Sequence, residues 1–271
     1  MVAALRCLVP YRVELRNPPD DTLDRLVSLG ALDIESTAGG LAALMPDAVD
    51  ASSLANVLGV ADVSVSPATG RDDSSVWILR PRTVRVGRFL LQPASLAPRP
   101  GVIMLSDGPA FGTGLHPTTA LCLEALEELI DLEMPQGVLD VGTGSGVLAL
   151  AALFAGVPRV VGVDIDPDAI AVAAGNARLN RFTGRFDLVR SGPEGLKGAW
   201  PLVLANVLAA PLIEMAPALV SRVQRGGRLV LSGVPDSMVA DVESVYVRLG
   251  MRRGGTRTRA GWAAVMLYPS W

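Results

Sequence analysis

The sequence predicts an α/β protein with a doubly wound, mostly parallel sheet in a larger domain, preceded by a smaller α+β domain. Two observations predict this fold class. From residue 101 onward, short apolar segments typical of buried strands alternate with segments of helical periodicity. Before residue 69 the segments are shorter, and two expected strands follow each other directly. Strands that alternate with helices are joined by crossovers, and crossovers produce a parallel sheet.

The smaller domain is expected to span residues 1–68. Its strands are expected at 8–15, 31–36, 41–45 and 61–66, and its helices at 18–30 and 49–58. This order is the split βαβ arrangement of a ferredoxin-like module. Residues 69–100 are expected to connect the two domains, because a polar stretch opens this segment and three prolines close it.

The larger domain is expected to span residues 101–271. Its strands are expected at 138–141, 159–164, 186–190, 202–205, 228–232, 251–257 and 261–267, and its helices at 147–155, 167–179, 211–223 and 237–249. In such sheets a ligand lies at the carboxyl ends of the strands, near the point where the strand order reverses. The functional residues are therefore expected in segment 140–146, at Asp164 and at Asn206.

Composition excludes several classes of function. The chain has 271 residues, of which 50% are hydrophobic and 19% charged, as in folded proteins rather than disordered ones. No apolar run reaches the roughly 18 to 20 residues of a membrane span, and the first residues lack the pattern of a signal peptide, so a cytoplasmic location is expected. Two cysteines and one histidine argue against a metal centre. The net charge of −3, without a basic stretch, argues against direct nucleic-acid binding. A monomer is expected.

The segment LDVGTGSG, residues 139–146, leaves an expected strand and enters an expected helix. Its glycines, Gly142, Gly144 and Gly146, allow the backbone to turn sharply and to approach a ligand closely. Asp164 ends the next strand, where a carboxylate can accept both hydroxyls of a ribose. The alternative is an ordinary turn with a solvated aspartate.

The glycine spacing distinguishes between nucleotides. A dinucleotide fingerprint needs a glycine at position 147, which is Val147. The spacing that starts at Asp140 is similar to the first motif of S-adenosylmethionine-dependent methyltransferases, whose ligand has no pyrophosphate. Methyl transfer is therefore favoured over hydride transfer, and a nicotinamide oxidoreductase is the least favoured alternative.

Asn206 ends the apolar segment LVLAN at the same expected edge of the sheet. An amine attacks a methyl group through a free lone pair, and neutralising a lysine of pKa about 10.4 costs roughly 4 to 5 kcal/mol at pH 7. An aspartate beside the amine would stabilise the ammonium, whereas an asparagine oxygen accepts an N–H bond without adding charge. Holding donor and acceptor in line is worth roughly 7 to 11 kcal/mol. The alternative is that Asn206 caps the following helix.

Four segments together resemble the PrmA-type ribosomal protein methyltransferases. These segments are FGTGLHPTTALCLEAL (111–126), LDVGTGSGVLALAAL (139–153), VVGVDIDPDAI (160–170) and LANVLAAPLIEMAPAL (204–219). That family methylates ribosomal protein L11 on lysine side chains and on the N-terminal amine. The resemblance implies a class I methyltransferase-like fold, S-adenosyl-L-methionine as cofactor, and an N-terminal domain that docks the protein substrate.

The resemblance also implies roles for individual residues. Those that contact the cofactor are Thr119, Gly142, Asp164 and Asn206, to which we add Asp140 and Gly144 of the same loop. Asn206 also borders the acceptor amine as the catalytic residue, and Phe111, Gly112 and Thr113 lie over the methionine end and the amine pocket. His116 belongs to this motif and is expected to start a helix or to pack against neighbouring residues rather than to act as a general base.

The leading hypothesis is therefore an S-adenosylmethionine-dependent N-methyltransferase that acts on amines of ribosomal protein L11. One alternative is a methyltransferase that acts on a lysine of another protein or on a small amine. The other is a non-catalytic module that only binds the cofactor.

Overall fold

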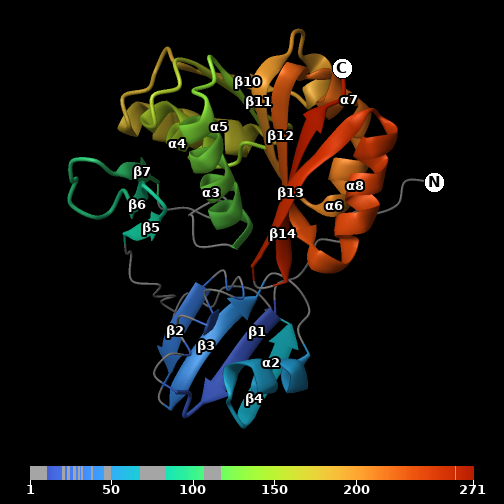
Figure 1. Ribbon diagram of the computed structural model, residues 1–271. Helices are drawn as coiled ribbons and strands as arrows, with labels where there is room; N and C mark the ends of the chain where they lie inside the picture. Colours follow the sequence, from blue (N-terminus) through green and yellow to red (C-terminus); the bar gives the residue numbers. More distant parts are fainter. Residues whose placement is uncertain are drawn as a thin grey trace. The chain divides into compact units, whose positions relative to one another are not determined.

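The chain divides into two compact units, Met1–Pro81 and Arg82–Trp271, each of which is described by itself (Figure 1). The computed structural model describes residues 11–19, 22, 25–26, 29, 31, 33–37, 39–45, 50–67, 83–106, 117–259 and 261–271. The division between the units falls inside segment 69–100, the expected connector. The second part of that segment, from residue 82, belongs to the larger unit.

The first unit contains an antiparallel sheet in the order β2-β3-β1-β4. Its elements are β1 (Tyr11–Arg16), β2 (Asp33–Thr37), β3 (Gly40–Met45), α2 (Ala51–Leu58) and β4 (Asp62–Pro67). Leu54 and Leu58 of α2 join strand residues such as Val13 and Leu15 in one core. This strand order confirms the expected ferredoxin-like arrangement. The helix expected at 18–30 lies largely outside the described residues.

The second unit is built on a seven-stranded sheet in the order β10-β9-β8-β11-β12-β14-β13 (Figure 1). Its strands are β8 (Val138–Val141), β9 (Val160–Asp164), β10 (Phe186–Arg190), β11 (Trp200–Asn206), β12 (Val223–Pro235), β13 (Met251–Arg259) and β14 (Trp262–Pro269). Strands β8 to β12 are parallel, and β14 runs antiparallel to both of its neighbours. The strand order reverses between β8 and β11, so the doubly wound prediction is confirmed and the switch point lies there.

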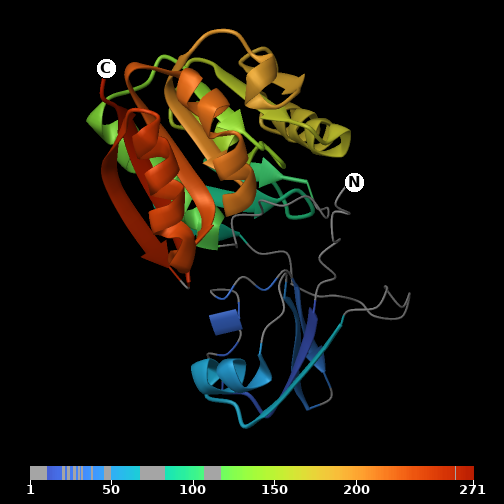
Figure 2. The same ribbon diagram turned by 90° about the vertical axis from the view of Figure 1, so that its right-hand side faces the viewer.

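Helices cover both faces of this sheet (Figures 1 and 2). One face carries α3 (Pro117–Leu132), α4 (Val147–Phe154) and α5 (Pro167–Leu179), and the other carries α6 (Ala209–Glu214), α7 (Ala216–Ser221) and α8 (Val239–Arg248). Two separate hydrophobic clusters fill the two interfaces. Strand β11 contributes to both, since Leu202 and Leu204 face the first cluster and Val203 and Ala205 the second.

Two expectations for the helices are corrected. The helix expected at 211–223 is instead the pair α6 and α7, and Val223 already belongs to β12. Pro217 has no N–H to donate to the preceding turn, so the ladder of helical hydrogen bonds is interrupted between α6 and α7. The extent of helix α3 was not predicted, although its start is implied at His116, because its first half is buried on nearly every side and lacks an amphipathic pattern.

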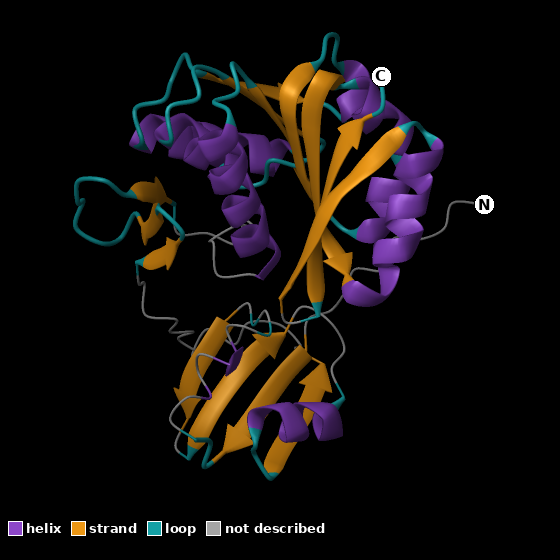
Figure 3. Cartoon of the chain, viewed as in Figure 1, coloured by secondary structure: helices purple, strands orange, loops and turns teal. Residues whose placement is uncertain are grey.

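A small three-stranded sheet precedes α3 (Figure 3). It consists of β5 (Val84–Val86), β6 (Phe89–Pro93) and β7 (Ile103–Leu105), with β6 and β7 parallel. Phe89, Leu91 and Ile103 are buried in the same cluster as α3 and α4. This sheet is therefore part of the larger unit. Within the described part of the chain, no helix is both long and apolar enough to cross a membrane.

Candidate active site

The glycine loop between β8 and α4 requires its glycines. Gly142, Gly144 and Gly146 have φ angles of 68°, 53° and 79°, in the left-handed region that side chains disfavour. A Cβ on Gly142 would lie 2.4 Å from Cγ1 of Val207, and a Cβ on Gly146 would lie 2.9 Å from Cε1 of Phe186. Both the conformation and the packing therefore select glycine. The contact with Val207 also shows that the loop lies beside the end of β11.

Asp164 ties the glycine loop to the end of β9. Its Oδ2 accepts a hydrogen bond of 3.0 Å from the N–H of Gly144, and its Oδ1 accepts one of 3.0 Å from the N–H of Asp166. A carboxylate oxygen accepts more than one hydrogen bond, so both oxygens keep acceptor capacity for a ligand. Asp164 is half-buried and occupies the strand end at which a ribose-binding acid was expected.

Asp140 is buried below the loop and has one unpaired oxygen. Its Oδ2 accepts hydrogen bonds from Oγ1 of Thr143, at 2.7 Å, and from the N–H of Ala149, at 3.3 Å. Its Oδ1 is buried and has no partner among the described residues. Burial raises the pKa of Asp140 to about 6, the charge of Asp164 adds to that rise, and the two hydrogen bonds oppose it. An unpaired buried acceptor of this kind fits a donor from a ligand.

Asn206 ends β11, and a hydrogen bond to α3 fixes its side chain. Its Nδ2 donates to Oγ1 of Thr119 in α3 over 3.3 Å, and Thr119 is fully buried. The Oδ1 of Asn206 is buried and unpaired among the described residues. Helix α6 has Leu208 at its N-cap position and no side-chain cap. The alternative that Asn206 caps this helix is therefore wrong.

Ser232 holds the start of α3 against the sheet at this position. It lies beside Asn206 in the register of β11 and β12, and its Oγ lies 3.2 Å from the carbonyl oxygen of Thr118 and 3.1 Å from that of Ala263. One hydroxyl proton is shared between these two acceptors. The neighbouring Thr119 is thereby held where the amide of Asn206 meets it.

The structure thus brings together six of the expected site residues, at the carboxyl ends of three strands and the start of α3: Thr119, Asp140, Gly142, Gly144, Asp164 and Asn206. Phe111, Gly112, Thr113 and His116 lie outside the described residues. Sequence reasoning assigned no role to Thr143, which bonds to Asp140. A hydroxyl three residues after an aspartate in a turn is the signal that could have identified it.

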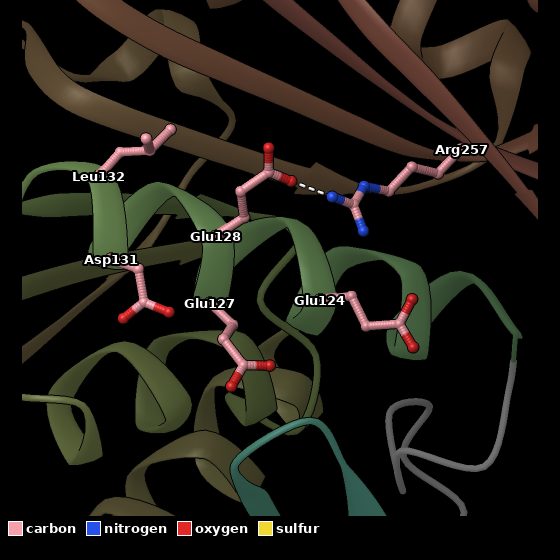
Figure 4. Close-up of a pocket in the computed structure, with 6 residues that line it drawn as sticks. All are labelled: Glu124, Glu127, Glu128, Asp131, Leu132 and Arg257. Atoms are coloured by element: carbon pink, nitrogen blue, oxygen red, sulfur yellow. Dashed lines mark hydrogen bonds and ion pairs between the residues drawn. The ribbon is translucent and has the colours of Figure 1, made fainter.

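A hollow of about 450 Å³ lies elsewhere, along the outer face of α3 (Figure 4). It is lined by Glu124, Glu127, Glu128, Asp131, Leu132 and Arg257. Glu128 pairs with Arg257, Glu124 pairs with Arg259, and Arg88 pairs with both Glu127 and Asp131. Arginines therefore pair with all four carboxylates, and these ion pairs tie α3 to neighbouring segments of the chain. Among the described residues, no group of three or more histidine, cysteine or acidic side chains could hold a metal ion.

Comparison with known proteins decides the family. Residues 57–268 match the family model described as Ribosomal protein L11 methyltransferase (PrmA). The chain belongs to this family. It is therefore an S-adenosylmethionine-dependent methyltransferase, as the sequence motifs predicted. Residues 1–56 lie outside the matched region.

Relatives named ribosomal protein L11 methyltransferase cover most of the chain. The protein of Pelobacter propionicus is 40% identical over 210 residues, which are 74% of this chain and 68% of that protein. The protein of Geobacter metallireducens is 42% identical over 208 residues, 75% of this chain and 68% of that protein. The crystal structure of ribosomal protein L11 methylase from Lactobacillus delbrueckii subsp. bulgaricus superposes with a TM-score of 0.62 at 26% identity, over 70% of this chain and 99% of that one.

The residues of this PrmA family member fit the cofactor. S-adenosylmethionine has a ribose diol and an ammonium group, both of which donate hydrogen bonds. The site offers acceptors to both: the carboxylate of Asp164, and the unpaired oxygens of Asp140 and Asn206. Membership of this family also excludes the hypothesis that the chain is a nicotinamide oxidoreductase.

Proposed function

We propose that this chain methylates lysine side chains and the N-terminal amine of ribosomal protein L11. The names of its relatives support the substrate. One observation supports the chemistry: Asn206 is a neutral amide at the strand edge, with its oxygen unpaired and its nitrogen held by Thr119. Bound S-adenosylmethionine supplies a methyl group on a positively charged sulfur.

The proposed cofactor contacts follow from the acceptors of the site. Asp164 accepts the ribose hydroxyls, Gly142 and Gly144 bring the backbone close to the cofactor, and Asp140 accepts a donor through Oδ1. The motif residues Phe111, Gly112 and Thr113, which lie outside the described residues, are proposed to cover the methionine end.

Asn206 is proposed to orient the acceptor amine. Because its Nδ2 donates to Thr119, the direction of Oδ1 is set, and this oxygen accepts an N–H from the amine. The nitrogen lone pair is then turned away from Asn206. A neutral oxygen stabilises the ammonium form less than a carboxylate would, so a larger share of the amine stays in the reactive free form. Positioning then supplies most of the rate enhancement.

The first domain, residues 1–68, is proposed to recognise the protein substrate, with residues 69–100 as the connector. We also propose that the protein acts as a cytoplasmic monomer without direct contact to nucleic acid. The separate compact unit at the N-terminus supports the division of roles.

The substrate is tested by incubating the purified protein with labelled S-adenosylmethionine and the ribosomal proteins of its own organism. We expect label on ribosomal protein L11, and peptide mass spectrometry should find it on lysine side chains and the α-amine. Label on another protein or on a small amine, with none on L11, would contradict the substrate. Cofactor binding without any labelled product would favour the non-catalytic alternative.

The cofactor contact of Asp140 predicts a pH dependence. Without ligand the pKa of Asp140 is about 6, and a donor on Oδ1 favours the ionised form and lowers that pKa. Binding therefore releases a proton below pH 6, and the affinity for S-adenosylhomocysteine falls by up to about tenfold for each pH unit below that value. Calorimetric titration over a pH series measures this fall.

The control is Asp140→Asn, which has no carboxyl to titrate. We expect its affinity to stay nearly constant over the same pH range. An equal fall in both proteins would place the proton on another group and would contradict the contact.

A further inference from the structure

Two asparagines, one turn apart, hold the chain near β7: Asn176 lies in α5, and Asn180 is the C-cap residue of that helix. The Oδ1 of Asn180 accepts the N–H of Met104 at 2.8 Å, and its Nδ2 donates to the carbonyl oxygen of Met104 at 2.6 Å. Strand β7 pairs with β6 through the ladder of Ile103 and its neighbours. The amide of Asn180 thus supplies to Met104 the donor and the acceptor that a further strand would supply.

Asn176 makes a different pair of bonds. Its Oδ1 accepts the N–H of Ser106, the residue after β7, at 2.7 Å. Its Nδ2 donates to the carbonyl oxygen of Ser145 at 2.8 Å. Asn176 is fully buried, and Ser145 is buried inside the glycine loop. A single side chain therefore joins three segments that are distant in sequence.

The carbonyl of Ser145 is the point at which Asn176 holds the glycine loop. It lies between Gly144 and Gly146, both with left-handed φ angles, and glycine pays the largest entropy cost when it is ordered. The N–H of Gly144 is the group that bonds to Asp164. The carbonyl of Ser145 and the N–H of Gly146 belong to one peptide unit, and that N–H donates to the carbonyl oxygen of Thr143 at 2.7 Å. A rotation of this unit would break that bond and change the surface of the loop. Replacing Asn176 removes the hydrogen bond that its Nδ2 donates to the Ser145 carbonyl, and this loss favours such a rotation.

We propose that Asn176 is a positioning residue for methyl transfer, because it holds the glycine loop in the conformation that binds S-adenosylmethionine. This proposal rests on the proposed role of the loop as the cofactor site. Asn180 is the matched control, since it is an amide at the C-cap of the same helix and its bonds hold Met104 of β7 rather than the loop. Neither residue was singled out by the sequence.

The test compares Asn176→Leu with Asn180→Leu, because leucine branches at Cγ as asparagine does but has no side-chain donor or acceptor. Both variants lose buried hydrogen bonds, so we expect both melting temperatures to fall. Only Asn176→Leu should weaken the binding of S-adenosylhomocysteine, by about tenfold. Its turnover at saturating cofactor should stay within about threefold of the parent, since it touches no reacting atom. Equal affinity in the two variants would overturn the proposal.

A second variant separates the two bonds of Asn176. At alkaline pH, Asn176→Asp keeps an acceptor for the N–H of Ser106 and has no donor for Ser145. We expect its affinity for S-adenosylhomocysteine to be at least as low as that of Asn176→Leu, and an affinity equal to the parent would overturn the proposal. Asp164→Ala separates a failure of the proposed role of Asn176 from a failure of the proposed cofactor site. If this variant keeps the parent affinity for S-adenosylhomocysteine, the cofactor site itself is wrong.

Discussion

Replacing Asn206 by aspartate lowers the rate of methyl transfer at neutral pH by about 100-fold or more, although the two side chains have the same shape. The carboxylate stabilises the ammonium form of the acceptor. The variant also lacks the N–H that Asn206 donates to Oγ1 of Thr119. We expect the rate to recover partly as the pH rises toward the pKa of the amine. Transfer of label to ribosomal protein L11, measured at saturating cofactor over a pH series, checks this result.

Two further variants separate charge from orientation. Asn206→Ala removes the acceptor without adding charge, so its rate falls and its pH profile keeps the parent shape. Thr119→Val removes only the oxygen that holds the amide, and we expect a smaller loss of about tenfold with no pH shift. An aspartate variant as fast as the parent at neutral pH would contradict the proposed role of a neutral acceptor.

Replacing Gly142 by alanine abolishes measurable binding of S-adenosylhomocysteine or weakens it by at least about 100-fold. The left-handed φ of 68° costs an alanine about 1–2 kcal/mol. The added Cβ would also lie 2.4 Å from Cγ1 of Val207, so the loop has to move. Calorimetry measures the affinity, and thermal unfolding measures the loss of stability.

The matched control is Gly184→Ala. Gly184 also has a left-handed φ, of 88°, but a Cβ there would meet nothing within 4 Å. It should lose a similar amount of stability from strain and keep its cofactor affinity. Adding Val207→Ala to Gly142→Ala removes the clashing methyl group and should restore part of the affinity. Weakening of equal size in the Gly184 variant would show that general destabilisation, not the loop, reduces binding.

Most of the sheet was predictable because each central strand is a short apolar run with helical segments on either side. Asp140, Asp164 and Asn206 were predictable for a related reason: parallel strands place their carboxyl ends at one edge. The glycine spacing then separated a methyltransferase loop from a dinucleotide loop. These are local patterns, and the structure realises them at the expected strand ends.

The rest depends on contacts between distant residues, which spacing does not reveal. Only the family resemblance predicted a role for Thr119, because its partner Asn206 lies 87 positions later in the chain. The extent of helix α3 was not predictable, because burial on nearly all sides removes the amphipathic pattern. Asn176 looks like an ordinary polar residue of α5, yet it is fully buried and bridges two loops.

A crystal structure of the full chain with S-adenosylhomocysteine tests most directly whether one pocket joins the three strand ends. We predict that the ligand lies across the carboxyl ends of β8, β9 and β11, with its ribose at Asp164 and its sulfur near Asn206. Binding in the hollow along the outer face of α3, or a ribose away from Asp164, would contradict the account.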